Sequence, residues 1–224
     1  MLEKLGLLAS LLPIISFIIF CNKKATKEIW VIFIYSVFSI LFDIYLSTSM
    51  WAYEHKFLIW NVFAILEYSL ITYFFYLIID SRIIRFLIII FSFFYVLIFL
   101  LYSKSNKDQF NSILSAFGSV IILILSLCFF IIALKPTAIP VENIFTPIFI
   151  IVVALLLYVA STLFLYIIAN KLSEKEMVQY WSINAYSSIL TSLIFTIAFI
   201  VFKYQKKSLT PENHTVDYTS PNDR

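Results

Sequence analysis

Seven apolar runs, each about the length of a bilayer-spanning helix, account for most of the chain. A helix that crosses a bilayer needs about 20 mostly apolar residues. Short polar connections separate the runs, which lie at about residues 5–21, 29–48, 57–79, 83–102, 110–134, 145–169 and 178–202. The sequence therefore predicts an all-α integral membrane protein, a single bundle of seven transmembrane helices with short loops.

The composition indicates the same class of protein. Hydrophobic residues make up 62% of the chain and charged residues 13%, against roughly 25% charged residues in ordinary soluble domains. So few polar residues cannot cover the apolar surface of a soluble domain, and lipid is the expected solvent. Spanning β-strands would alternate apolar and polar residues over roughly 10 positions. The run FLIIIFSFFYVLIFLLY, residues 86–102, does not alternate.

The chain divides into two parts at residue 202. Residues 1–202 form the predicted seven-helix transmembrane domain, and Pro13 predicts a kink in its first helix. The following segment, KYQKKSLTPENHTVDYTSPNDR, has few apolar residues and two prolines. This composition predicts a polar, disordered cytoplasmic tail over residues 203–224. The first run lacks the small residues of a signal-peptide cleavage site, so we expect it to be retained.

Lysine and arginine predict the orientation, because cytoplasmic loops carry an excess of both. The N-terminus and the loops on its side carry Lys4, Lys56, Lys104, Lys107, Lys171 and Lys175. The opposite side carries Lys23, Lys24, Lys27, Arg82, Arg85, Lys135, Lys203, Lys206, Lys207 and Arg224. This asymmetry favours a bacterial inner-membrane protein with its N-terminus outside and its C-terminus in the cytoplasm. The net charge of +3 then reflects topology and the membrane surface, and does not indicate nucleic-acid binding.

Two acidic side chains fall inside the apolar runs, where a charge is costly. Glu67 lies near the middle of the run 57–79, and Asp43 lies in the run 29–48. No Lys, Arg or His lies deep in any run, so neither acid has an obvious cationic partner. Each acid must be protonated, hydrogen-bonded to neutral groups or hydrated. Ionisable residues at such depths usually face other helices or a watery cavity, which makes both acids candidate site residues.

Other polar side chains recur at helical spacing and share a depth with the two acids. With the N-terminus outside, they fall in the outer half of the bundle or near its midplane. We interpret them as a candidate ligand-binding or ion-binding cavity that opens outward, formed by Glu67, Asp43, Asn61, Tyr68, Ser161, Thr162, Asn184 and Ser188. The alternative is ordinary hydrogen bonding between helices, with each bond worth about 0.6 kcal/mol.

A stripe of small and polar residues marks the run 110–134. Asn111, Ser115, Gly118 and Ser119 recur at spacings of three and four, which places them on one face of the predicted helix. Small residues let helices approach each other closely in a membrane. The stripe therefore predicts a seam between packed helices.

Three segments resemble a family of small seven-helix membrane proteins of Bacteroidota. WNVFAILEY is similar to the family pattern N-x-Y-x-x-x-E-[FY], and PIFIIVVALLLYVASTLFLYIIANKL to its P-x-F-W-x-x-x-x-x-x-x-Y-x-x-x-T-x-F segment. YWSINAYSSILTSLIF is similar to its W-x-I-x-x-x-x-N-I-x-x-N-I-x-Y end. Phe63 stands where the family usually has tyrosine, and Ser188 and Ser192 stand where it often has asparagine. The resemblance implies the seven-helix membrane fold and implies no reaction.

The motifs favour a protein that is not an enzyme. The sequence has no HExxH, no GxSxG and no paired histidines, and its two cysteines form no CxxC. We therefore favour a sensor or accessory subunit without a cofactor or metal, which binds a small ligand or lipid in the outer cavity. It would act among membrane lipids with a partner membrane or regulatory protein, or as a homo-oligomer, and not with nucleic acid.

Two other classes of function remain open. The first is a transporter, channel or pore-forming membrane effector, for instance of a phage-defence system. The second, ranked lower, is an intramembrane lipid enzyme that uses Asp43 and Glu67 as acid and base.

Overall fold

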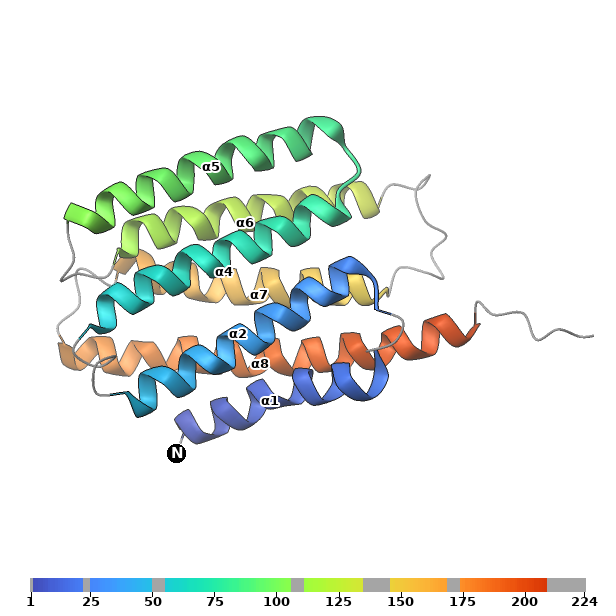
Figure 1. Ribbon diagram of the computed structural model, residues 1–224, viewed down its shortest axis with the longest axis horizontal. Coiled ribbons are helices and arrows are strands. Elements are labelled where there is room, and N and C mark those ends of the chain that lie inside the picture. The colour runs from blue at the N-terminus through green and yellow to red at the C-terminus, as the bar shows by residue number, and fades with distance from the viewer. Residues whose placement is uncertain are drawn as a thin grey trace, which may run out of the picture.

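The computed structural model describes residues 2–21, 25–49, 55–105, 111–134, 146–168 and 174–208. The helices are α1 (Leu2–Phe20), α2 (Lys27–Thr48), α4 (Lys56–Ile78), α5 (Arg82–Ser105), α6 (Ser112–Ala133), α7 (Pro147–Ile168) and α8 (Glu174–Ser208). They lie side by side in one bundle (Figure 1). The described ranges contain seven helices and no strand, which confirms the predicted all-α fold.

Six of the described helices are long and apolar enough to cross a membrane. The apolar part of α1, Leu5–Phe20, is shorter. At 1.5 Å per residue it reaches about 24 Å, against a hydrocarbon core of about 30 Å. The prediction of seven full-length spans therefore holds for six helices by length and composition, and α1 is the short member of the bundle.

Six helices form a closed ring, and α5 packs outside it. In the ring, α1 packs against α2 and α8, α7 against α6 and α8, and α4 against α2 and α6. Helix α5 packs against α4 and lies at the edge of the bundle (Figure 1). We call the end of the bundle at which α1 begins the N-face, and the opposite end, at which α8 ends, the C-face.

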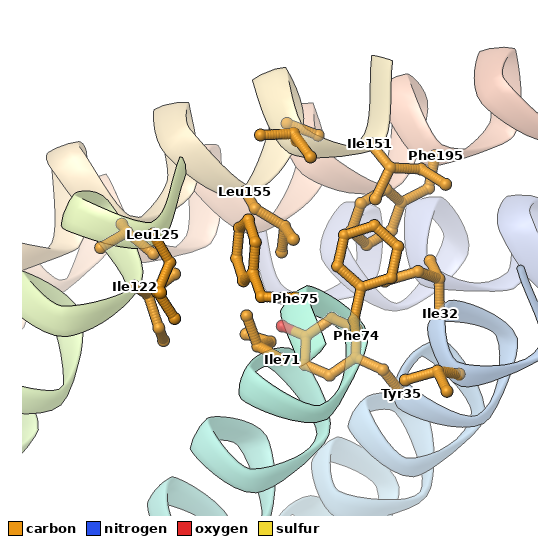
Figure 2. Packing of buried hydrophobic residues seen from close by; sticks show 14 of the residues in the cluster. Ile32, Tyr35, Ile71, Phe74, Phe75, Ile122, Leu125, Ile151, Leu155 and Phe195 are labelled. Carbon is orange, nitrogen blue, oxygen red and sulfur yellow. The ribbon is translucent and has the colours of Figure 1, made fainter. Parts of the chain in front are cut away.

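The apolar core fills the half of the bundle nearest the C-face. The largest fully buried side chains are Phe17, Phe74, Phe75, Phe99, Phe195, Phe199, Ile29, Ile32, Ile71, Ile79, Ile151 and Leu155. All of these except Phe99 belong to the C-face half of their helix. Figure 2 shows side chains from α2, α4, α6, α7 and α8 converging on this cluster.

Buried residues in the N-face half are more often polar. They include Asn61, Asn111, Ser112, Ser115, Thr162 and Ser187. The bundle is therefore asymmetric along its length, with an apolar half at the C-face and a more polar half at the N-face. The sequence predicts that the polar side chains gather toward one end of the bundle, and this asymmetry agrees with that part of the prediction.

The predicted small-residue stripe of α6 lies at helix contacts. Ser115, Gly118 and Ser119 are buried. A Cβ atom added at Gly118 would lie 2.8 Å from the hydroxyl oxygen of Tyr95 on α5. Tyr95 is 2% exposed, and its ring centre lies 3.9 Å from that of Tyr68 on α4. Gly118 therefore leaves the space in which this α5 side chain packs against α4 and α6.

Helix α8 extends beyond the predicted end of the transmembrane domain, because residues 203–208 continue the helix to Ser208. The Lys203 ammonium group lies 4.7 Å from the centre of the Phe20 ring, which joins the C-face ends of α8 and α1. Residues 209–224 of the predicted tail lie outside the described residues.

Truncation after Ser208 should leave the melting temperature in detergent nearly unchanged. The removed sequence has few apolar residues and should contribute within about 0.5 kcal/mol of the free energy of unfolding. Truncation after Phe202 is the matched variant, because it also removes the Lys203–Phe20 contact, worth about 0.5–1 kcal/mol. An equal, large decrease in melting temperature in both variants would show that residues 209–224 dock onto the bundle.

Candidate functional site

Glu67 lies at the middle of α4, eleven residues from both Lys56 and Ile78. At 1.5 Å per residue, this places Glu67 about 16 Å from each end of the helix. Its carboxyl group accepts a hydrogen bond of 2.9 Å from the Tyr35 hydroxyl on α2. The Tyr158 hydroxyl on α7 also interacts with this carboxyl group. One acidic side chain thus joins three helices near the centre of the bundle.

Neutral hydroxyl groups take the place of a cationic partner for Glu67. The groups that interact with its carboxyl are Tyr35, Tyr158 and Asp43, and no described lysine, arginine or histidine contributes. A hydrogen bond to a charged group is worth about 1.5–3 kcal/mol, so the Tyr35 hydroxyl offsets part of the desolvation cost. Glu67 remains half-buried, which leaves it partly accessible to water-sized molecules.

Asp43 and Tyr166 extend the cluster toward the N-face. Asp43 is exposed on α2, five residues from Thr48 at the N-face end of that helix, and interacts electrostatically with Glu67. Tyr166 is half-buried, two residues from Ile168 at the N-face end of α7, and interacts with Tyr158 and Glu67. We call Glu67, Tyr35, Tyr158, Tyr166 and Asp43 the Glu67 cluster.

A small cavity lies beside the two tyrosines that contact Glu67, among α1, α2, α7 and α8. It is lined by Ser10, Pro13, Tyr35, Ser36, Ser39, Tyr158, Ser188, Thr191, Ser192 and Phe195. Its volume is about 20 Å³, and one water molecule needs about 10–15 Å³. The cavity therefore admits a guest the size of a water molecule and is too small for a lipid or a metabolite.

The cavity is rich in hydrogen-bond acceptors. Ser10, Ser36 and Thr191 donate their hydroxyl protons to carbonyl groups of their own helices at 2.8–3.0 Å. Tyr35 donates to Glu67, and the Tyr158 hydroxyl interacts with the same carboxyl group. All five oxygens keep acceptor lone pairs. Pro13 also lacks the N–H that would bond to the carbonyl of the residue four positions earlier, which leaves that acceptor free of its helical partner. Such a cavity suits a guest that donates hydrogen bonds or carries positive charge.

The eight predicted site residues occupy several places in the bundle. Ser188 lines the cavity, and Glu67 is hydrogen-bonded to Tyr35 and interacts with Tyr158, which both line it. The hydroxyl groups of Ser161 and Thr162 donate to carbonyl groups of α7 at 2.8 and 2.9 Å. Hydrogen bonds within α7 thus satisfy the hydroxyl protons of both residues.

The remaining predicted residues, Asn61, Tyr68 and Asn184, lie apart from the cavity lining. Asn61 is 1% exposed, and its Oδ1 accepts a hydrogen bond of 3.1 Å from the backbone N–H of Asn111, which joins α4 to α6 at the N-face. Tyr68 packs against Tyr95 of α5. Asn184 lies on α8, and its buried Oδ1 has no hydrogen-bond partner in the part of the chain that the structure describes.

Three tyrosines of the Glu67 cluster, Tyr35, Tyr158 and Tyr166, are not among the predicted site residues. Their depth in the bundle is the sequence signal that could have identified Tyr35 and Tyr158. Tyr35 lies thirteen residues from the N-face end of α2 and Tyr158 ten residues from that of α7, close to the eleven residues of Glu67. An acid without a cationic partner needs hydroxyl or amide donors at its own depth, and few side chains in these helices can supply them.

Comparisons with known proteins find no family model, no curated protein and no solved structure that matches the chain. The resemblance to the seven-helix family of Bacteroidota stays a prediction. The function is therefore argued from the geometry of the Glu67 cluster and its cavity.

Proposed function

We propose that the protein is a multi-pass membrane protein of the bacterial inner membrane. Large apolar side chains point away from the bundle on every helix, and Ile83, Ile113 and Ile131 are 74%, 69% and 66% exposed. Apolar surface of this extent marks a contact with lipid or with another protein. After a wash with alkaline carbonate the protein should stay in the membrane pellet, and detergent should be needed to release it.

We further propose that the N-face lies outside the cell and the C-face in the cytoplasm. The asymmetry of lysine and arginine supports this orientation. Arg82, Arg85 and Lys203 belong to the C-face ends of their helices, and Arg85 forms an ion pair of 3.1 Å with Asp80 there.

Cysteine labelling in intact cells tests the orientation. In a variant without Cys21 and Cys128, Asn106→Cys should react with a membrane-impermeant maleimide, because residue 106 follows α5 at the N-face. Lys207→Cys at the C-face should not react until the cells are permeabilised. The reverse pattern would place the C-face outside.

Within this membrane protein, we infer that the Glu67 cluster is the ligand site of a non-enzymatic sensor or accessory subunit. The observation that carries this proposal is the hydrogen bond from Tyr35 of α2 to Glu67, together with the interaction of Tyr158 of α7 with the same carboxyl group. A ligand that occupies the carboxyl group competes with these contacts. Its binding therefore favours a different packing of α2, α4 and α7, which is the differential interaction that a sensor requires.

The cavity supports a small ligand class for this sensor. A space of about 20 Å³, lined mostly by hydroxyl-bearing side chains, fits a proton carried by water, a small cation or another compact polar molecule. Partner proteins would then respond to the arrangement of the helices.

Distance measurements between spin labels test the sensor proposal. Labels at the exposed positions Ile34 on α2 and Leu157 on α7, in nanodiscs, should report a distance that changes with pH or with Na⁺ concentration. Glu67→Gln should abolish the change, and Glu28→Gln at the C-face end of α2 is the matched control. A wild-type distance that is the same under all these conditions would contradict the proposal.

A transporter, channel or pore is the second candidate, favoured by the place of Pro13 on the cavity wall. Backbone carbonyl groups freed from helical bonding coordinate ions in many transporters. Proteoliposomes that contain a pH-sensitive dye separate the candidates. A Glu67-dependent flux of protons or Na⁺ would support transport, and release of a larger trapped dye would support a pore. Liposomes that show neither ion flux nor dye release would support the sensor.

A further inference from the structure

We propose that an open groove between α1 and α8 binds an acyl chain of a phospholipid from the leaflet on the N-face side of the membrane. This inference rests on the proposed membrane location, and it does not depend on which ligand occupies the Glu67 cluster. It assigns a second site, with its own class of ligand, to the lipid-facing side of the bundle.

The groove follows the seam between two helices that lie side by side (Figure 1). Both helices begin at the N-face, and the groove runs from Leu5 to Ile15 of α1. Ala9 lines it and is 7% exposed, so this small side chain lies at its floor. The larger side chains that line it include Leu5, Leu8, Leu12 and Ile15 of α1 and Tyr186 and Ile189 of α8.

The outer edge of the groove is open to the surroundings of the bundle. Leu5, Leu8, Leu12 and Ile15 recur at intervals of three and four residues, which places them on one face of α1. Leu5, Leu8 and Ile15 are 48%, 60% and 49% exposed. In a membrane, the surroundings of an apolar helix face are the acyl chains of lipids, so these chains have direct access to the groove.

The length of the groove matches one leaflet of a bilayer. Leu5 and Ile15 are ten residues apart, or about 15 Å along the helix, and half of the hydrocarbon core is also about 15 Å. The volume of the groove is about 570 Å³, within the range of about 300–1,000 Å³ that is usual for apolar ligand pockets. An acyl chain of the N-face leaflet therefore meets the groove along its whole length.

The size of the groove argues against a helix or a protein surface as its occupant. A volume of about 570 Å³ divided by a length of about 15 Å gives a cross-section of about 38 Å². A helix with its side chains is about 10–12 Å across, which corresponds to about 80–110 Å². Eight residues line the groove, against about 20–30 residues on each side of a stable protein interface. A single hydrocarbon chain is narrower than a helix, and it is flexible enough to follow the seam.

Packing favours a chain in this groove over a chain elsewhere on the bundle. Lipid tails are as apolar as leucine, so association inside a membrane depends on van der Waals contacts and not on burial from water. A chain in the groove contacts α1 and α8 at the same time and gains dispersion contacts on both sides. The outer face of α5 is the contrast, because its exposed side chains, such as Ile83 and Leu101, belong to a single helix. We therefore expect the groove to hold a chain longer than the α5 face does.

The groove and the polar cavity beside Glu67 share the α1–α8 pair as a wall. On α1, Leu12 lines the groove and the adjacent Pro13 lines the cavity. On α8, Ile189 lines the groove and the adjacent Ser188 lines the cavity. An acyl chain in the groove thus supports the wall of the candidate site from the lipid side.

Photo-crosslinking of the full chain in nanodiscs tests the site. The probe is a phosphatidylethanolamine that carries a diazirine in the middle of one acyl chain. Mass spectrometry should find adducts on the groove residues about threefold or more as often as on Ile83 and Leu101 of α5. Leu12→Trp fills the groove and should reduce the groove adducts by about threefold or more. Leu193→Trp is the matched control, at a 42% exposed position of α8 outside the lining, and should leave them unchanged.

Two results would overturn the acyl-chain site. The first is an equal yield of adducts on the groove and on α5, or a groove yield that Leu12→Trp does not lower. The second comes from the protein with Leu8 replaced by the photoreactive amino acid benzoylphenylalanine, which leaves Leu12 intact and needs no filled groove. Its crosslink to phospholipid would support the site, and a crosslink to a second copy of the chain or to another protein would overturn it.

Neither result decides the proposed function. The membrane location fails when the carbonate wash releases the protein, and the sensor site fails when the α2–α7 distance does not respond to pH or Na⁺.

Discussion

Glu67→Leu should leave the protein folded and abolish the response of the α2–α7 distance to pH and Na⁺. Removing an acid from a helix centre relieves about 2.5–3.5 kcal/mol on insertion scales. The same substitution leaves the Tyr35 hydroxyl without its acceptor and removes the carboxyl group with which Tyr158 interacts, at about 1–3 kcal/mol for each buried hydroxyl left unpaired. The two effects nearly cancel in the free energy of unfolding, so the melting temperature should change little while the response is lost.

Glu67→Gln separates the geometry of the site from its chemistry. The glutamine side-chain oxygen can still accept the hydrogen bond from Tyr35 and contact Tyr158, so the resting α2–α7 distance should match that of the wild type. The response to pH should be absent, because the amide does not titrate. A Glu67→Leu protein that responds to pH and Na⁺ as the wild type does would show that Glu67 is a packing residue.

Gly118→Ala should destabilise the bundle by about 1–3 kcal/mol, the usual cost of overpacking a filled interior. The added methyl group would lie 2.8 Å from the Tyr95 hydroxyl oxygen and 3.0 Å from the adjacent ring carbon. Tyr95 is wedged against Tyr68, so it cannot move away without displacing α5. Thermal unfolding in detergent measures the effect.

Gly6→Ala is the matched control for Gly118→Ala. A Cβ atom at Gly6 meets no heavy atom within 4 Å, and alanine is favoured over glycine in a helix by about 1 kcal/mol. Gly6→Ala should therefore be neutral or stabilising. Tyr95→Phe should recover part of the loss in Gly118→Ala, because it removes the nearest contact. Equal melting temperatures for the two glycine variants would contradict the close packing of α5 against α6.

The number of helices and the bounds of most of them follow from the sequence, because the thickness of a bilayer sets the length of an apolar run. The predicted run 57–79 corresponds to α4, Lys56–Ile78, and the predicted run 29–48 corresponds to α2, Lys27–Thr48. The uneven distribution of polar residues along the bundle follows for the same reason, since the position of a residue in an apolar run predicts its height along the bundle. The continuation of α8 to Ser208 was not predicted, because a polar sequence can remain helical outside the apolar layer.

The neighbours of each helix do not follow from the sequence. Helical spacing shows which residues share a face, and nothing in it specifies that α8 closes the ring against α1 or that α5 lies outside. Glu67 and Tyr68 illustrate the consequence, because adjacent positions on one helix reach different partners, Tyr35 on α2 and Tyr95 on α5. The hydroxyl groups around Glu67 could be expected as a chemical type, and only the packing identifies Tyr35 and Tyr158.

Reaction with a hydrophobic carbodiimide tests the central claim, that Glu67 is a polar site inside a membrane protein. Dicyclohexylcarbodiimide partitions into lipid and modifies carboxyl groups there, so mass spectrometry of treated membranes should locate the adduct at Glu67. The adduct should be absent in Glu67→Gln and should persist in Glu28→Gln, and a water-soluble carbodiimide should modify Asp80 and other exposed acids first. An adduct confined to acids at the helix ends, with Glu67 unmodified in the wild type, would contradict the claim.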